Sequence, residues 1–423
     1  MNTLPPGPSG ALRQSLAYSA DPYGYGRSMC RRYGDPYTMP MPMGPIVVCS
    51  HPEAVRLMFT APSDTFDVWA REQLLPVFGE DSIFTLVGAE HKRHRPVVME
   101  ACRYRGDMLD VCQAMLTRLV PGQSIALAPF LLNLSLEVIL DVVFGLRGDD
   151  ETRTMLSDYV YASGSTAVTL PLCYPSWRRN LYPPWPRFLR LRDRLRARLS
   201  DIVQARRSDT VQRADMLTIL GRHFDTKTTV DEVLTLLIAG HESTARSITF
   251  TCELLAQHPE TMRRVQMEID SLSEDASLAQ ICALPFLDAV CDESLRLHPV
   301  AVQWSRTLRK PFDVAGYSLP AGISVALSSY LVQRRAEIFA EPDVFRPERF
   351  LDKRPGAFEF FPFGGGPTRC PGAALAKDEM KTVLFYLLRR FTLQPKRKQP
   401  VRTEVKGLVM APHDDVVMTL MSR

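Results

Sequence analysis

The 423-residue chain lacks the marks of several protein classes. No uninterrupted apolar stretch approaches about 18 residues, so the sequence predicts no transmembrane helix. Its N-terminus, MNTLPPGPSGALRQS, has no apolar signal-peptide core. The net charge of +4 and the absence of a long lysine or arginine block argue against nucleic acid as a partner. Internal repeats and low-complexity linkers are also absent.

The cysteines are few and scattered. There are 9 of them, an odd number, and no CxxC pair occurs. This usage argues against a disulfide framework and a zinc ribbon and fits a reducing cytosol. Apolar content of 45% and charged content of 23% are those of an ordinary globular protein with a large core. The cysteine usage therefore indicates a cytoplasmic protein. We also expect a monomer.

One cysteine stands in an informative setting, FGGGPTRCPG at 363–372. Three glycines allow a close approach of the backbone to Cys370, and Pro371 suits the first position of a helix. The dipole and free N–H groups of a helix N-terminus lower a cysteine's pKa and hold its sulfur as an anion. Such a thiolate suits an axial ligand of haem iron. The alternative is a glycine-rich turn before an ordinary helix with a buried, inert cysteine.

A long apolar helix is predicted in the middle of the chain. Thr229 to Glu232 form a capping-box sequence, and the apolar run continues to Gln257, before His258-Pro259. At 1.5 Å per residue, these roughly 28 residues span about 40 Å. The middle of the run reads AGHEST (239–244), and an acid and hydroxyls there are costly to bury without partners.

Weaker patterns indicate the remaining elements. We expect a strand at Ile46–Cys49, a helix at Pro52–Phe59 and mostly helices over 107–257. Two strands, Phe312–Leu319 and Ile323–Ser329, are expected around the turn Pro320-Ala321-Gly322.

Three further motifs carry charge. The predicted helix Pro285–Leu297 holds Glu293 and Arg296, which are three apart and so share a face. The segment FRPERF (345–350) contains Arg349, and EHKRHRP (90–96) contains His91 and Arg95, four apart. Arginine suits carboxylates because its planar fork can bond them bidentately. Taken alone, these could be surface pairs or a solvated basic helix end.

In order and spacing, these segments resemble the cytochrome P450 superfamily over essentially the whole chain. Phe363, Gly366, Cys370 and Gly372 reproduce the haem-binding signature of that superfamily. The resemblance implies a mainly α protein with small β-sheets, a triangular-prism fold with a long central distal helix and a proximal haem-thiolate loop. It also implies a single catalytic domain over 1–423 without a fused reductase, of the soluble, bacterial type.

The resemblance implies haem b, iron protoporphyrin IX, as the cofactor, with the Cys370 thiolate as the axial ligand and the metal-binding residue. In the family the small Ala-Gly pair, here Ala239-Gly240, admits dioxygen, and an acid–alcohol pair relays protons. That role goes to Glu242 and Ser243. The family usually has threonine at the position of Ser243. A role for Thr244, shared with Ser243 or in its place, is therefore an open alternative. His241 is expected to point to the side of the helix and not to act as a ligand.

The resemblance also implies haem contacts beyond the sulfur. The residues concerned are His91, Arg95, Arg306, Phe363, Gly364, Thr368 and Gly372. The family usually has a basic residue at the position of Thr368, which leaves that propionate contact and the role of Arg369 open. Arg93 is an alternative to Arg95 as a contact of the haem carboxylates. Glu293, Arg296 and Arg349 are expected to form a buried network that supports the haem pocket.

The segments that match the family's pocket walls are apolar, so we expect an apolar substrate such as a terpenoid, fatty acid or steroid. They are Phe66–Phe84, Tyr161–Tyr174, Leu236 with Ala239, Val300–Trp304 and Leu408–Met410. O₂ is the second substrate, and electrons are expected from a ferredoxin or flavodoxin with its reductase. A basic surface near the cysteine would receive that acidic partner: Arg103, Arg105, Lys353, Arg354, Arg369, Lys377 and Lys381.

Two other functions are weighed against a monooxygenase. A peroxide-using peroxygenase or an oxygen-independent isomerase is one, although such relatives generally lack the acid–alcohol pair. A non-catalytic haem sensor is the other, although sensing normally needs an output domain.

Overall fold

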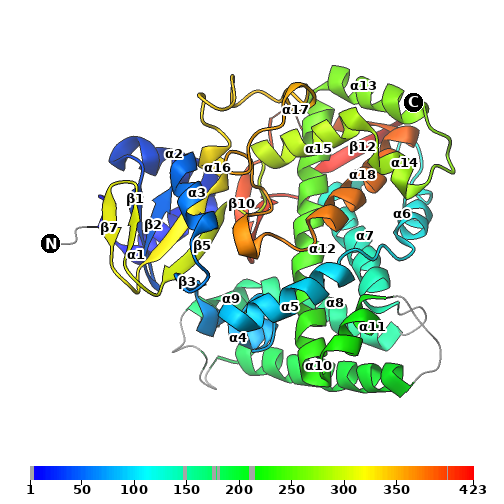
Figure 1. Cartoon of the computed structure of the whole chain (residues 1–423). Coiled ribbons are helices and arrows are strands. Elements are labelled where there is room, and N and C mark those ends of the chain that lie inside the picture. The colour runs from blue at the N-terminus through cyan, green and yellow to red at the C-terminus, as the bar shows by residue number, and fades with distance from the viewer. Residues whose placement is uncertain (1–3, 146–149, 174–177, 179–181, 209–214, 398) are drawn as a thin grey trace.

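The structure is a computed structural model that describes residues 4–145, 150–173, 178, 182–208, 215–397 and 399–423. A helical body occupies one side of the molecule, and a sheet with α1, α2 and α3 occupies the other (Figure 1). Helix α12 runs through the length of the body. Helices α4, α5 and α10 lie near one end of α12, and α13, α15 and α18 lie toward the other (Figure 1).

The helices of the N-terminal half include the expected one after residue 52. They are α1 (Ala11–Ala20), α2 (Pro22–Tyr33), α3 (Pro52–Thr60), α4 (Arg71–Phe78), α5 (Gly88–Ala101), α6 (Met108–Leu116), α7 (Leu127–Phe144), α8 (Asp150–Gly164), α9 (Thr166–Cys173) and α10 (Pro184–Ser208). The others are α11 (Met216–His223), α12 (Thr226–Gln257), α13 (Pro259–Asp270), α14 (Leu278–Cys282), α15 (Pro285–Leu297), α16 (Ser329–Val332), α17 (Arg349–Asp352) and α18 (Ala373–Arg390). The predicted helix at Pro285–Leu297 is confirmed at both ends.

The largest sheet has the strand order β1-β2-β8-β5-β3. Its strands are β1 (Tyr37–Met41), β2 (Gly44–Cys49), β8 (Ser324–Ser328), β5 (Gln303–Leu308) and β3 (Phe66–Val68). Three small sheets complete the fold: β4 (Ser124–Ala126) with β12 (Val417–Ser422) and β9 (Phe391–Pro395), β6 (Phe312–Val314) with β7 (Tyr317–Leu319), and β10 (Thr403–Lys406) with β11 (Val409–Pro412).

The expected strand Phe312–Leu319 is wrong in one respect. It is a hairpin of two short strands, β6 and β7, which pair with each other. Ala315 and Gly316 both have positive φ (51° and 80°) at its turn, the geometry of a type I′ turn. The following strand β8 pairs instead with β2 and β5. A single residue pair with left-handed backbone, which composition alone did not reveal, divides the segment.

Helix α12 begins earlier than the capping-box sequence predicts. Asp225 is the N-cap, and its side chain accepts a hydrogen bond from Thr228 N–H. Thr229 and Glu232 therefore lie inside the helix, both buried, and Glu232 bonds other elements. Asp225, four residues before the predicted cap Thr229, caps the helix instead, and the helix is longer by about one turn.

Helix α7 differs from the expectation that no helix is apolar and long enough to cross a membrane. It has 18 residues and a mean hydropathy of 1.9, enough by length and composition. Asn133, Ser135, Glu137 and Asp141 interrupt its apolar run, which is why the sequence rule excluded it. The helix packs against α12, and 67% of it is buried. That burial is typical of a core helix.

The predicted charge network is present and buried. The two carboxylate oxygens of Glu293 accept Arg296 Nε at 2.7 Å and Nη2 at 2.8 Å, and neither side chain is exposed. Arg349 Nε donates to Glu293 at 3.1 Å, and Arg346 N–H donates at 2.8 Å. Arg296 also donates to the carbonyl of Gln333. The network ties α15 to α17 and to the segments before and after it.

Replacement of Arg296 by methionine is expected to lower the free energy of unfolding by about 3–5 kcal/mol, because it leaves the Glu293 carboxylate buried without its main partner. Urea unfolding followed by circular dichroism measures the loss. The control is Arg263→Met on α13, whose pair with Glu260 is solvent-exposed and worth under about 1 kcal/mol. Equal losses in the two variants would contradict a supporting role for the network.

A buried acid on α18 gives the fold a pH dependence. Glu379 is 2% exposed, and burial raises its pKa from 4.5 to about 8 despite the nearby Ser135 hydroxyl. The folded protein thus holds a proton that the unfolded chain releases, so Glu379 makes stability fall as pH rises from about 4.5 to about 8.

Glu379→Gln should remove this contribution, because the amide is neutral at every pH. Urea midpoints of both proteins, measured below and above that window, give the test. The wild-type midpoint should decline more steeply with rising pH than the variant's. Parallel pH profiles would show that Glu379 is ionised in the folded state.

Candidate haem-thiolate site

The loop that carries Cys370 is held by its own backbone. Cys370 N–H donates to the Phe363 carbonyl at 2.9 Å, which closes the loop, and Gly366–Thr368 form a short 3₁₀ turn within it. Helix α18 begins at Ala373 with Gly372 as its N-cap, so Pro371 precedes the cap and is not the first helical residue. The sulfur nevertheless lies at the N-terminus of α18, as predicted.

Two glycines of the loop have left-handed backbone, with φ of 67° at Gly364 and 62° at Gly366. A Cβ at Gly364 would lie within about 3 Å of the Trp304 ring, and one at Gly366 would overlap the carbonyl of Phe59. The space that these glycines leave is therefore filled by Trp304 and Phe59. Gly364 and Gly366 therefore let the loop pack closely against Trp304 of β5 and Phe59 of α3.

The thiol itself does not have a lowered pKa in the protein alone. Burial raises the pKa of Cys370, while Gly372 N–H and the positive charges of Arg369 and Arg95 lower it by less. The predicted stabilising groups are present, but desolvation exceeds them. A bound cation would supply the missing compensation, since a coordinating thiol is deprotonated outright.

Two of the predicted anchors converge on the loop from different elements. Arg95 of α5 donates to the Arg369 carbonyl at 2.8 Å, and Arg306 of β5 donates to the Thr368 hydroxyl. Thr368, which stands where the family usually has a basic residue, thus orients Arg306. Within the described part of the chain, both guanidinium groups bond carbonyl and hydroxyl oxygens and no carboxylate.

Desolvation without an acidic partner lowers the pKa of Arg306 to about 10. Burial and the charges of Arg95 and Arg306 lower the pKa of His91, also on α5, to about 4, so the imidazole is neutral at pH 7. Arg93, the open alternative, is exposed and pairs with Glu90 at 2.6 Å, which leaves Arg95 as the residue at the loop. The cluster is ready to receive an anionic group.

The middle of α12 faces open space. Ala239 is exposed although most residues of the helix on both sides are buried. Ser243, four residues on and hence on the same face, is partly exposed and donates to the Ala239 carbonyl at 2.6 Å. Thr244 is 3% exposed and donates to the Gly240 carbonyl at 2.8 Å. A Cβ at Gly240 would lie 2.9 Å from Ile139 of α7, so this side of the helix is packed.

His241 and Glu242 lie on other faces of the same turn. His241 is buried against α7, where its Nε2 bonds the Leu132 carbonyl at 3.0 Å, and burial lowers its pKa to about 4. Burial raises the pKa of Glu242, whereas Arg246, which donates to it at 3.2 Å, opposes that shift. A Cβ at Gly164 or Gly407 would lie within about 4 Å of Glu242 Oε2, so the carboxylate faces the end of α8 and the β10–β11 turn.

The predicted basic surface is partly neutralised. Lys377 bonds Asp288 and Asp292, both at 2.8 Å, and Lys381 bonds Asp288 at 3.2 Å. Arg105 pairs with Asp378 at 2.7 Å, and Arg354 pairs with Asp288 at 3.2 Å. Exposed cations that remain from the predicted set are Arg103, Lys353 and Arg369. The sequence could not show which lysines the neighbouring helix α15 would neutralise.

Comparisons with known proteins agree with this geometry. A family model described as cytochrome P450 matches residues 6–418. The chain is 29% identical over 432 residues to cytochrome P450 135B1 of Mycobacterium tuberculosis, covering 97% of this chain and 90% of that protein. It is also 29% identical over 433 residues to cytochrome P450 138 of the same organism, covering 97% and 95%. Both names are provisional.

A solved structure titled retinoic acid bound cyanobacterial CYP120A1 superposes with a TM-score of 0.86 over 100% of both chains, at 23% identity, which shows the shared fold. The chain belongs to the cytochrome P450 family. Proteins of this family hold iron protoporphyrin IX through an axial cysteine thiolate and are in general haem monooxygenases. Cys370 is the cysteine at that position here. Arg95 and Arg306 at its loop bond no carboxylate among the described residues, so they can receive the anionic groups of a haem. The exposed turn at Ala239 leaves a face of α12 open toward a planar group.

Some polar residues near the site escaped the sequence interpretation. Trp304 presents a buried Nε1 that has no hydrogen-bond partner among the described residues. Glu379 lies nine residues after Cys370 on the helix that starts there, directly after Lys377 and Asp378, so no signal in the sequence indicated that this acid would be buried. Residue Tyr174, the last of the predicted wall segment Tyr161–Tyr174, lies outside the described residues.

Arg306→Met is expected to speed the loss of haem by about tenfold, because it removes a charged hydrogen-bond donor from the cluster. Transfer of haem to an excess of apomyoglobin, followed by absorbance, measures the rate. Arg309→Met, on the same chain segment but exposed and paired with Asp67 at 3.3 Å, is the matched control. Unchanged haem loss in the Arg306 variant would exclude it as a haem anchor.

Proposed function

We propose that this protein is an O₂-dependent monooxygenase of apolar substrates. One oxygen atom enters a C–H or C=C bond, and the other is reduced to water by two electrons and two protons. The haem supplies the oxygen-activating chemistry when bound, with Cys370 as axial ligand. The protein orients the substrate, excludes water and moves protons. The observation that carries the proposal is the Ser243 hydroxyl on the exposed face of α12 at Ala239.

The proton-delivery residues are Glu242 and Ser243. Ser243 shares the exposed face with Ala239, whereas Thr244 is buried and faces the packed side of the helix. The raised pKa of Glu242 brings it nearer to the working pH, where an acid both takes up and releases protons effectively. These positions support Ser243, and not Thr244, as the hydroxyl that we propose for the relay.

His91, Arg95 and Arg306 are proposed to hold the haem carboxylates. Phe363, Gly364, Thr368 and Gly372 shape the thiolate loop, and Gly240 lets α12 pack closely on α7. Glu293, Arg296 and Arg349 support the pocket from the proximal side.

Large apolar side chains in three predicted wall segments support an apolar substrate. Phe84, Tyr161 and Leu408 are 43%, 52% and 55% exposed. The wall segment at 300–304 meets the one at 408–410 through the Met410 N–H, which donates to the Val300 carbonyl at 2.9 Å. A terpenoid, fatty acid or steroid fits such walls, and the cyanobacterial structure is titled as bound to retinoic acid.

Electrons are proposed to come from a separate ferredoxin or flavodoxin with its reductase. Arg103, Lys353 and Arg369 are the exposed cations for docking, a smaller set than the sequence indicated. We also propose that 1–423 acts as one catalytic domain, as a cytoplasmic monomer.

The carbon-monoxide difference spectrum of the reduced protein tests thiolate ligation, and NADPH use coupled to product tests the activity with ferredoxin and reductase added. Ser243→Ala is expected to lower product per NADPH by about tenfold or more, with peroxide released instead, since a positioned proton-transfer group contributes about 10²–10⁴-fold.

Thr244→Ala is the matched control, because it removes a neighbouring hydroxyl on the packed side, and its coupling should stay near the wild-type value. The reverse ranking of the two variants would assign the relay to Thr244. Full coupling in both would refute a hydroxyl relay in α12.

A further inference from the structure

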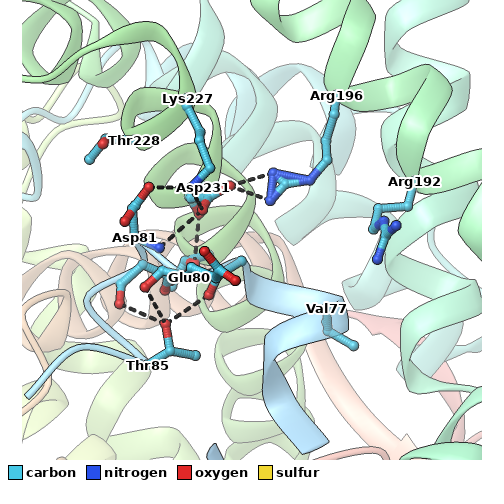
Figure 2. Close-up of polar contacts among 12 residues, drawn as sticks. Val77, Glu80, Asp81, Thr85, Arg192, Arg196, Lys227, Thr228 and Asp231 are labelled. Atoms are coloured by element: carbon cyan, nitrogen blue, oxygen red, sulfur yellow. Dashed lines mark hydrogen bonds and ion pairs between the residues drawn. The ribbon is translucent and has the colours of Figure 1, made fainter. Parts of the chain in front are cut away.

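Asp231 in α12 is a fully buried carboxylate that joins three separate elements. Its oxygens bond the guanidinium of Arg196 on α10 and accept the Asp81 backbone N–H at 3.1 Å (Figure 2). Lys227, one turn earlier on α12, lies 4.0 Å from Asp231 and also pairs with the Asp81 side chain. The side chain of Asp231 has 0% exposure, whereas those of Arg196 and Lys227 are 25% and 59% exposed.

The turn that meets this carboxylate is shaped for it. Gly79 has φ of 90°, and a Cβ there would overlap the Asp231 carboxylate. Thr85 closes the turn by donating to the Gly79 carbonyl at 2.8 Å and approaching the Ser82 carbonyl at 3.1 Å (Figure 2). Backbone therefore contacts the carboxylate directly, which only glycine allows at this position.

Successive residues of the same segment are fixed to one stretch of α12. After Asp81, the Ser82 hydroxyl bonds the Thr235 hydroxyl at 2.6 Å, and Ile83 N–H donates to Glu232 Oε1 at 2.9 Å. His94 of α5 bonds that same Glu232 oxygen at 2.9 Å. The segment 79–85, which we name the distal turn, has therefore little freedom to shift relative to α12.

The distal turn borders the haem site. Thr235, which it contacts, is four residues before Ala239 and so lies on the same face of α12 as the exposed turn. The distal turn carries the exposed Phe84 and leads into α5, which holds His91 and Arg95. A displacement of this turn would change the width of the space beside Ala239.

Helix α10 reaches the same place from the other side. Besides Arg196, its Arg192 donates to the Pro76 carbonyl at 3.3 Å. Tyr159 of α8 donates to the Val77 carbonyl at 2.6 Å. These bonds hold α4, which directly precedes the distal turn. Among the described residues, α10 makes its charged contact with Asp231 through Arg196.

We propose that Asp231 is a positioning residue that fixes the distal turn to α10 and thereby limits the size of ligand that reaches the haem iron. This inference rests on the proposed function. Without the carboxylate, the Arg196 guanidinium and the Asp81 N–H both lose their shared acceptor, and a buried donor without a partner favours movement toward water.

The test compares a small and a bulky ligand that bind ferric haem through the same nitrogen, imidazole and 4-phenylimidazole. In Asp231→Asn, stopped-flow absorbance should show association and dissociation of 4-phenylimidazole faster by about tenfold. Imidazole, which needs no extra width, should bind at wild-type rates. The carbon-monoxide spectrum of the variant should stay unchanged, because Asp231 does not touch the thiolate loop.

Asp193→Asn is the matched control. Asp193 is an acid on α10 that is 63% exposed, and its ion pair among the described residues is with neighbouring Arg192. The rates of this variant should equal those of wild type. Arg196→Met removes only the contact of α10 with Asp231. It should also speed the association and dissociation of 4-phenylimidazole. It provides the same test if Asp231→Asn fails to retain haem.

Unchanged 4-phenylimidazole rates in a folded, haem-loaded variant would overturn the inference, as would an equal acceleration of both ligands. A wild-type protein that binds neither azole would instead refute the haem site, so the two failures are distinguishable.

Discussion

Positive charge without an acidic partner is the constraint on which the site depends. Arg95 and Arg306 come from a helix and a strand far apart in sequence, and both bond the loop of Cys370. Guanidinium groups inside a protein are costly unless they are paired. Among the described residues, these two guanidinium groups bond only carbonyl and hydroxyl oxygens, so a bound anionic cofactor would balance their charge. A bound iron would likewise offset the desolvation that raises the pKa of the Cys370 thiol.

Helix α12 organises the other side of the site by presenting different chemistry at successive turns. Near its start, Asp231 and Glu232 hold the distal turn and α5. Two turns later, Ala239 and Ser243 form an exposed face, while Gly240 and Thr244 face the packed side. A rigid helix keeps these groups at fixed spacing, so in the proposed function one element would set both substrate access and proton delivery. The cost is two adjacent acids buried in one turn, which the contacts of Arg196 and His94 compensate.

The sequence predicted those parts that are encoded locally. The helix Pro285–Leu297 and the Glu293–Arg296 pair depend on near neighbours, and the structure contains both as expected. The loop at Cys370 is placed at the start of α18 as expected, although Pro371 precedes the helix. Family membership added the long-range partners. Features decided by distant contacts were missed or wrong: the start of α12 was set by a competing cap at Asp225, and Lys377 was neutralised by aspartates of α15. The buried junction at Asp231 joins α10, α12 and the distal turn, which no spacing rule relates.

The central claim is that the Cys370 sulfur binds the haem iron. Resonance Raman spectra of the ferric protein, grown with ordinary or heavy-isotope cysteine sulfur, test it most directly. The account predicts an iron–sulfur stretching band that moves to lower frequency with the heavier isotope and is lost in Cys370→Ser. A haem-loaded protein whose spectrum contains no isotope-sensitive band, or keeps one without Cys370, would contradict it.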